Sequence, residues 1–124
     1  MEITVFYKDN IGTLRATVID NRPFFFANDV DTIIRPIGKP EEIIKTKVAP
    51  EDHKKAQIKG ELIDLIAMMG VYEFIRLDFA DTYSPFKYWF TDEILPVMVV
   101  KAAGMSPENV HVLDAVKCYH HENL

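Results

Sequence analysis

The sequence is poor in cysteine: Cys118 is the only one in 124 residues, so the chain cannot form an internal disulfide. A single thiol fits a reducing compartment, and we expect a cytoplasmic protein. The longest apolar run, Ile94 to Val100, contains Pro96 and is far too short to cross a bilayer. The first residues carry neither a basic segment nor a long apolar stretch, so we expect no secretory signal.

Motifs for catalysis, phosphate loops and metal sites are also missing. The glycine at Gly38 lacks the second glycine and the Lys-Ser/Thr ending of a phosphate loop, and Asp29 to Asp31 lacks the later ligands of a calcium loop. Four possible metal ligands gather near the carboxyl end: His111, Cys118, His120 and His121. A structural zinc site usually needs four ligands at recurring spacings, and the sequence has no second cluster. We therefore expect no metal, no cofactor and no enzymatic activity.

Positive charge is scarce except in one segment. The net charge is −5, which gives the chain little general attraction for nucleic acid. Residues 35–59 hold seven basic and four acidic side chains (+3), whereas residues 1–34 sum to −2 and residues 60–124 to −6. Only this middle segment is expected to attract phosphate. Its candidate nucleic-acid-binding residues are Lys45, Lys47, Lys54, Lys55 and Lys59.

Alternation of apolar and polar residues predicts several short strands. Residues 2–9 and 13–20 alternate, and Pro23 to Phe26 continues them after a turn at Asp20 to Arg22, which indicates an antiparallel meander. Among the three phenylalanines, at least one ring must point opposite the others. Residues 56–69 are interpreted as two strands around Lys59-Gly60, forming a central hairpin.

Helices are expected between and after these strands. One starts at Ala27 or Asn28 and ends at Pro36, and a second opens at Pro40. Residues 48–55 are expected to form a loop, with room for one helical turn. Gly70 is expected to turn the chain from the hairpin into a helix, and residues 108–124 suit either a helix or a strand. The order predicts an α+β fold rather than a βαβ repeat. We expect one domain over residues 1–104, with residues 105–124 as an extension packed on it.

Residues 84–104 combine helical periodicity with a proline. Phe86, Trp89 and Phe90 share one predicted face, which favours a packed core over a platform for stacking bases. Glu93 falls on the same face, either as a structural acceptor or as a catalytic or binding acid; the absence of a companion acid, histidine or nucleophile favours the structural role. Pro96 predicts a bent but continuous helix from about Pro85 to Ala103.

Three blocks carry a resemblance to a known family: "NRPFFFANDVDTII", "LIDLIAMMGVYEFI" and "FKYWFTDEILPVM". In this order they resemble the Bro-N domain, the amino-terminal module of phage antirepressors and of baculovirus repeated-ORF proteins, over residues 3–104. The matching positions are Phe25, Ala27, Asp29, Val30, Gly70, Tyr72, Ile75, Phe86, Trp89, Glu93, Leu95 and Pro96. The chain departs from the pattern at Ala67 and Met68, where that family usually has an asparagine and a glutamate.

The resemblance implies a phage- or prophage-type regulatory domain that acts in transcription regulation and binds DNA weakly. The alternative is a protein-interaction or dimerisation module that binds a repressor or a second copy of itself, which the acidic net charge favours. A continuous positive strip through Lys45, Lys47, Lys54 and Lys55 favours DNA, whereas an exposed apolar patch favours a protein partner.

Overall fold

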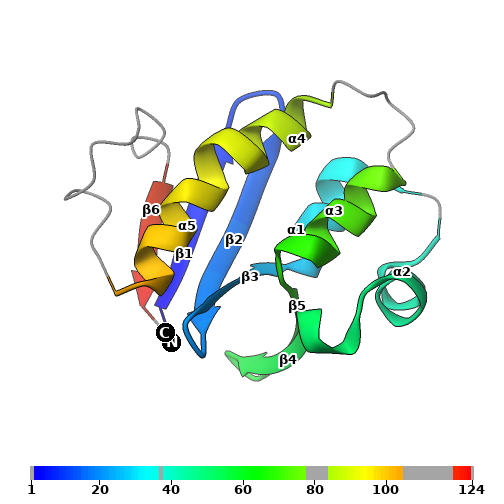
Figure 1. The fold of residues 1–124 in the computed structure, drawn as a ribbon, viewed down its shortest axis with the longest axis horizontal. Helices are drawn as coiled ribbons and strands as arrows, with labels where there is room; N and C mark the ends of the chain where they lie inside the picture. The colour runs from blue at the N-terminus through cyan, green and yellow to red at the C-terminus, as the bar shows by residue number, and fades with distance from the viewer. Residues whose placement is uncertain (1, 37, 78–83, 105–118, 124) are drawn as a thin grey trace.

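The protein has an α+β fold (Figure 1). The structure is a computed structural model that describes residues 2–36, 38–77, 84–104 and 119–123, the last range as backbone only. Within these residues, no helix has both the length and the apolar character needed to cross a bilayer.

One antiparallel sheet of six strands forms the base of the described fold. Its strands are β1 (Glu2–Lys8), β2 (Gly12–Ile19), β3 (Arg22–Phe26), β4 (His53–Ile58), β5 (Glu61–Ile66) and β6 (Tyr119–Asn123). The spatial order is β4-β5-β3-β2-β1-β6, so β4 and β6 are the outermost strands. The predicted meander and the predicted hairpin are both confirmed, and they join where β3 pairs with β5.

Two tight turns fix the register of this sheet. Ile19 pairs with Arg22 across Asp20-Asn21, and both turn residues have positive φ angles (52° and 63°). This is the twist that two-residue hairpins favour, and Asp and Asn tolerate it well. The β4–β5 hairpin turns in the same way at Lys59-Gly60, where the φ angles are 52° and 83°.

Short helices follow the strands, as predicted. They are α1 (Ala27–Ile34), α2 (Pro40–Lys47), the 3₁₀ turn η1 (Pro50–Asp52) and α3 (Met68–Arg76). Two boundaries differ from the prediction. β4 begins at His53, inside the expected loop, and α3 already begins at Met68. Gly70 is therefore a helical residue rather than the turn into the helix.

The sequence from Pro85 to Ala102 forms one continuous helical segment, as predicted. It consists of α4 (Pro85–Trp89), a π-helical turn η2 (Phe90–Ile94) and α5 (Leu95–Ala102) (Figure 1). The amide of Leu95 donates to the carbonyl of Phe90, five residues back. Pro96 follows directly, and a proline has no amide for the turn before it and crowds the carbonyl four residues back. The wider π turn accommodates this ring without breaking the helix.

The main core lies between the helices and one face of the sheet. Phe25 of β3 packs edge-to-face on Phe90, with 4.9 Å between the ring centroids. Phe86, Trp89 and Phe90 are 3%, 2% and 0% exposed, which confirms the predicted core and rules out Trp89 as an exposed stacking platform. The indole Nε1 of Trp89 is buried and has no hydrogen-bond partner among the residues that the structure describes.

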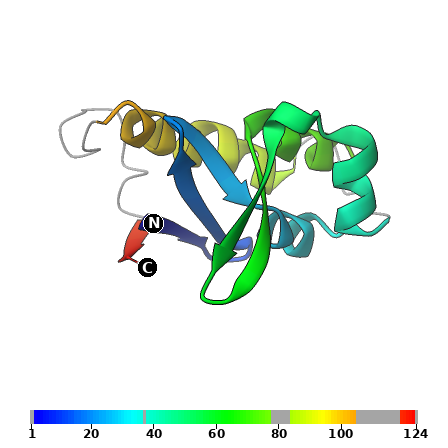
Figure 2. The same cartoon turned by 90° about the horizontal axis from the view of Figure 1, so that it is seen from below.

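A second, smaller core lies on the opposite face of the sheet. Phe24 and Phe26 point there, away from Phe25, as the alternation of a strand requires. The β4–β5 hairpin projects away from the helices (Figure 2) and curls under this face, because Ile58 and Ile63 line one pocket together with Ile3 of the distant strand β1. Phe24 and Phe26 are both buried, and the described residues clustered with them come from strands and from Ala67, the residue before α3.

Two ion pairs tie the long helical segment to β1. Lys8 donates a 2.9 Å hydrogen bond to Glu93 Oε2, and Lys101 donates to the hydroxyl of Thr4 and lies 3.3 Å from the carboxylate of Glu2. Glu93 thus accepts a hydrogen bond from Lys8, and this contact agrees with the structural role that the sequence favours.

The carboxyl-terminal extension is described only through β6. This strand pairs antiparallel with β1, with Val5 opposite His120. The rest of the extension, including His111 and Cys118, lies outside the described residues, as does the choice between helix and strand for residues 108–118.

Candidate functional site

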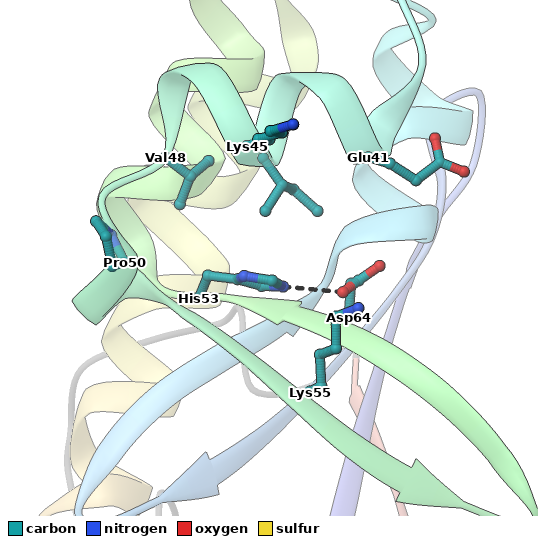
Figure 3. Close-up of a pocket in the computed structure, with 8 residues that line it drawn as sticks. Glu41, Lys45, Val48, Pro50, His53, Lys55 and Asp64 are labelled. Atoms are coloured by element: carbon teal, nitrogen blue, oxygen red, sulfur yellow. Dashed lines mark hydrogen bonds and ion pairs between the residues drawn. The ribbon is translucent and has the colours of Figure 1, made fainter.

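A hollow of about 320 Å³ lies between α2 and the β4–β5 hairpin (Figure 3). We call it the α2–hairpin hollow. Eight residues line it: Glu41, Ile44, Lys45, Val48, Pro50, His53, Lys55 and Asp64. Two predicted lysines, ten positions apart in the sequence, thus line the same hollow.

Strand register places three of these side chains on one face of the hairpin. Lys55 pairs directly with Asp64, and His53 pairs with Ile66, so His53 lies diagonally opposite Asp64. Alternate residues of a strand share a face, which puts His53 and Lys55 together. Ile66 belongs to the main core, so this is the face that carries the helices.

The helix α2 forms the other wall because it is amphipathic. Ile43 and Ile44 are buried, whereas Lys45 and Lys47 are exposed in the last turn. Pro40 begins the helix, and its first turn carries two acidic residues, where the helix dipole favours them. The lysines in turn suit the carboxyl end of the helix dipole.

An imidazole–carboxylate pair occupies the floor of the hollow. His53 Nε2 and Asp64 Oδ1 are 2.8 Å apart, and both side chains are about one quarter exposed (24% and 28%). An ionised carboxylate can only accept hydrogen bonds, so the proton of this bond belongs to Nε2. The bond fixes the orientation of the imidazole and leaves Asp64 Oδ2 as a further acceptor.

The two lysines of the hollow are uncommitted cations. Within the described part of the chain, neither Lys45 nor Lys55 has an ion pair or a side-chain hydrogen bond. Many other cations are engaged. Arg15, for example, makes a bidentate pair with Asp29, and Arg22 pairs with Asp52. Exposed ammonium groups without carboxylate partners are the groups that an external anion can reach.

The other predicted lysines are spread over different surfaces. Lys47 is exposed on α2 but does not line the hollow. Lys54 lies on the opposite face of β4 from Lys55, 3.7 Å from Asp20 and 5.8 Å from the ring centroid of Phe24. Lys59, in the hairpin turn, lines a separate pocket beneath the sheet. A single positive strip through all five lysines is therefore not formed.

The residue types in the α2–hairpin hollow suit binding better than covalent catalysis. None of its described lining residues is a serine, threonine or cysteine that His53 could activate as a nucleophile. Throughout the described residues, no group of three or more histidine, cysteine or acidic side chains is placed to hold a metal ion. What the hollow offers is two cations, two carboxylates, an oriented imidazole and an apolar wall.

Sequence reasoning identified the two lysines but missed His53, Asp64 and Glu41. The missed signal was the hairpin itself. A two-residue turn at Lys59-Gly60 dictates that Lys55 faces Asp64, and His53 follows on the same face. Nothing in the sequence indicated Glu41, because its position beside the hairpin depends on how α2 packs against the rest of the fold.

Comparisons with known proteins return no relative of this chain: no family model, no curated protein and no solved structure matches it. The Bro-N resemblance therefore stays a prediction from the sequence blocks.

Proposed function

We propose that this chain is a regulatory domain of the phage antirepressor type that contacts nucleic-acid phosphates weakly through Lys45, Lys47 and Lys55. The observation that carries the proposal is the convergence of α2 and β4, which brings two uncommitted ammonium groups to one hollow, with a third on the same helix. The sequence resemblance supports the same function. Lys54 and Lys59 are left out because they lie elsewhere.

Weak, salt-dependent binding follows from the charges. An acidic chain offers no general attraction, so local phosphate neutralisation has to supply the affinity. Each phosphate contact contributes about −0.9 to the slope of log affinity against log salt. Three lysines therefore predict a slope of about −3.

A salt titration of binding to a labelled mixed-sequence duplex, read by fluorescence anisotropy, tests this function. Exchanging Lys45 and Lys55 for glutamate should reduce the magnitude of the slope by about 2 and weaken binding to all sequences alike. Lys87→Glu is the matched control, because Lys87 is also exposed but lies on α4. Binding that ignores salt, or that the double exchange leaves unchanged, contradicts the proposal.

A protein-interaction module is the second candidate, and exposed apolar side chains favour it. Leu62 of β5 is 59% exposed, and Met68 and Met69 at the start of α3 are 41% and 48% exposed. Large apolar side chains at the surface contribute to protein interfaces when they are contiguous. Absence of DNA binding at every salt concentration, together with a dimer in size-exclusion chromatography, would support this candidate instead.

A further inference from the structure

The α2–hairpin hollow has two chemically different walls (Figure 3). The helix α2 and the turn after it contribute three apolar residues, Ile44, Val48 and Pro50, beside the charged Glu41 and Lys45. The strands contribute only polar residues, which are His53, Lys55 and Asp64. Ligand sites commonly combine an apolar surface with a few convergent polar groups in this way. A flat phosphate-contact surface needs no such apolar wall, so the proposed DNA contact leaves this feature unexplained.

We propose that the hollow binds a terminal phosphate monoester attached to a nucleoside, either a free nucleoside 5′-monophosphate or the 5′-phosphorylated end of a nucleic-acid strand. This inference deepens the proposed function: binding of a 5′-phosphorylated strand end rests on the proposed contact with nucleic acid, whereas binding of a free nucleotide does not. In this arrangement Lys45 and Lys55 hold the phosphate, and the apolar wall packs against the base.

The two lysines of the hollow, rather than its net charge, favour a monoester over a backbone diester. Glu41 and Asp64 line the same hollow and balance the two ammonium groups, so direct contact with the lysines has to select the phosphate. A phosphate monoester carries about −1.5 to −2 charges near neutral pH, whereas a backbone phosphate carries one. Two uncommitted ammonium groups match the larger charge.

The carboxylates provide acceptors for the nucleoside. Asp64 uses Oδ1 for His53, and its second oxygen has no hydrogen bond among the described residues. Glu41 is exposed at the α2 side of the hollow and also lacks a described partner. Sugar hydroxyls and base amino groups can donate hydrogen bonds to these oxygens.

Nitrogen–proton NMR spectra of the full chain, titrated with deoxyadenosine monophosphate, test the proposal. Amide shifts should concentrate at residues 44–55 and 61–66. Adenosine without phosphate and inorganic phosphate should each bind at least about tenfold more weakly, the loss expected for one charge-assisted hydrogen bond. Exchanging Lys45 and Lys55 for glutamine should abolish the shifts. Lys87→Gln should leave them intact, because Lys87 is also exposed but lies on α4, outside the hollow.

Two single-stranded oligonucleotides, one with a 5′-phosphate and one with a 5′-hydroxyl, show whether the hollow binds strand ends or free nucleotides. Displacement of the nucleotide by the phosphorylated strand alone assigns the hollow to strand ends, and displacement by neither assigns it to free nucleotides. Equal binding of adenosine and its monophosphate, or shifts elsewhere, overturns the proposal. If nucleotide binding fails this test but duplex binding still depends on salt as expected, only the nucleotide proposal is wrong and the proposed function stands. If the nucleotide binds but no duplex does, only the proposed function is wrong.

Discussion

Gly70 lies at a close contact in α3, and its replacement by alanine tests how tightly α2, β5 and α3 pack. A Cβ atom at this position would lie 2.9 Å from Cβ of Ile66 and 3.2 Å from Cγ1 of Val48. Alanine normally stabilises a helix interior by about 0.5–1 kcal/mol over glycine. Overpacking a core costs about 1–3 kcal/mol, and the Ile66 Cβ cannot rotate away because it is bonded to the backbone. The cost of the clash with Ile66 therefore exceeds the stability that alanine gains from its higher helix propensity.

We expect Gly70→Ala to lower the free energy of unfolding by about 0.5–2 kcal/mol. For a chain of this size that corresponds to a melting temperature lower by roughly 2–8 °C, measurable by circular dichroism. Met69 is 48% exposed one residue earlier, so Met69→Gly and Met69→Ala calibrate the glycine-to-alanine difference in the same helix without the clash. If Gly70→Ala raises the melting temperature by the calibrated amount, the packing argument is wrong.

Two further predictions concern buried polar atoms. Trp89→Ala should lower the free energy of unfolding by about 3–5 kcal/mol. Trp89→Phe should cost much less, because it keeps an aromatic ring in the core and removes an unsatisfied indole N–H. Equal losses of the two variants in urea unfolding would contradict this. Burial, with a smaller contribution from Glu41, raises the pKa of Asp31 above its usual value of 3.8. The folded state therefore binds the proton more tightly, so stability falls as pH rises through that raised pKa. Asp31→Asn should be more stable than the wild type near neutral pH, and this advantage should vanish in acid; an advantage that does not change with pH would refute it.

The fold was more predictable than the site because periodicity reports local structure directly. Turn residues at Asp20-Asn21 and Lys59-Gly60 fixed two hairpins, and alternation fixed which side chains share a face. Gly70 was misread because a glycine between a strand and a helix resembles a turn, whereas its real constraint is the contact with Ile66 and Val48. Such a contact joins three elements and leaves no local signature.

The candidate site depended on the same kind of information. Local charge identified Lys45 and Lys55, but it equally identified Lys54, which the pleat of β4 turns to the other face. The local balance of charge treats neighbouring residues alike, whereas neighbouring side chains of a strand point to opposite faces of the sheet. Only the packing of α2 over the hairpin decides which cations meet.

The position of β4 in the sheet gives its lysines a second role. Strand β4 is one of the two outermost strands of the sheet, and among the described residues no strand pairs with its far side, so the backbone amides and carbonyls there can pair with another extended chain. Lys54 and Lys55, adjacent on this strand, point to opposite faces and discourage two copies from joining there, since like charges would be brought together. A ligand that neutralises Lys55 removes part of this protection. Binding of the proposed ligand to Lys55 would therefore also favour pairing of two copies of the protein along β4.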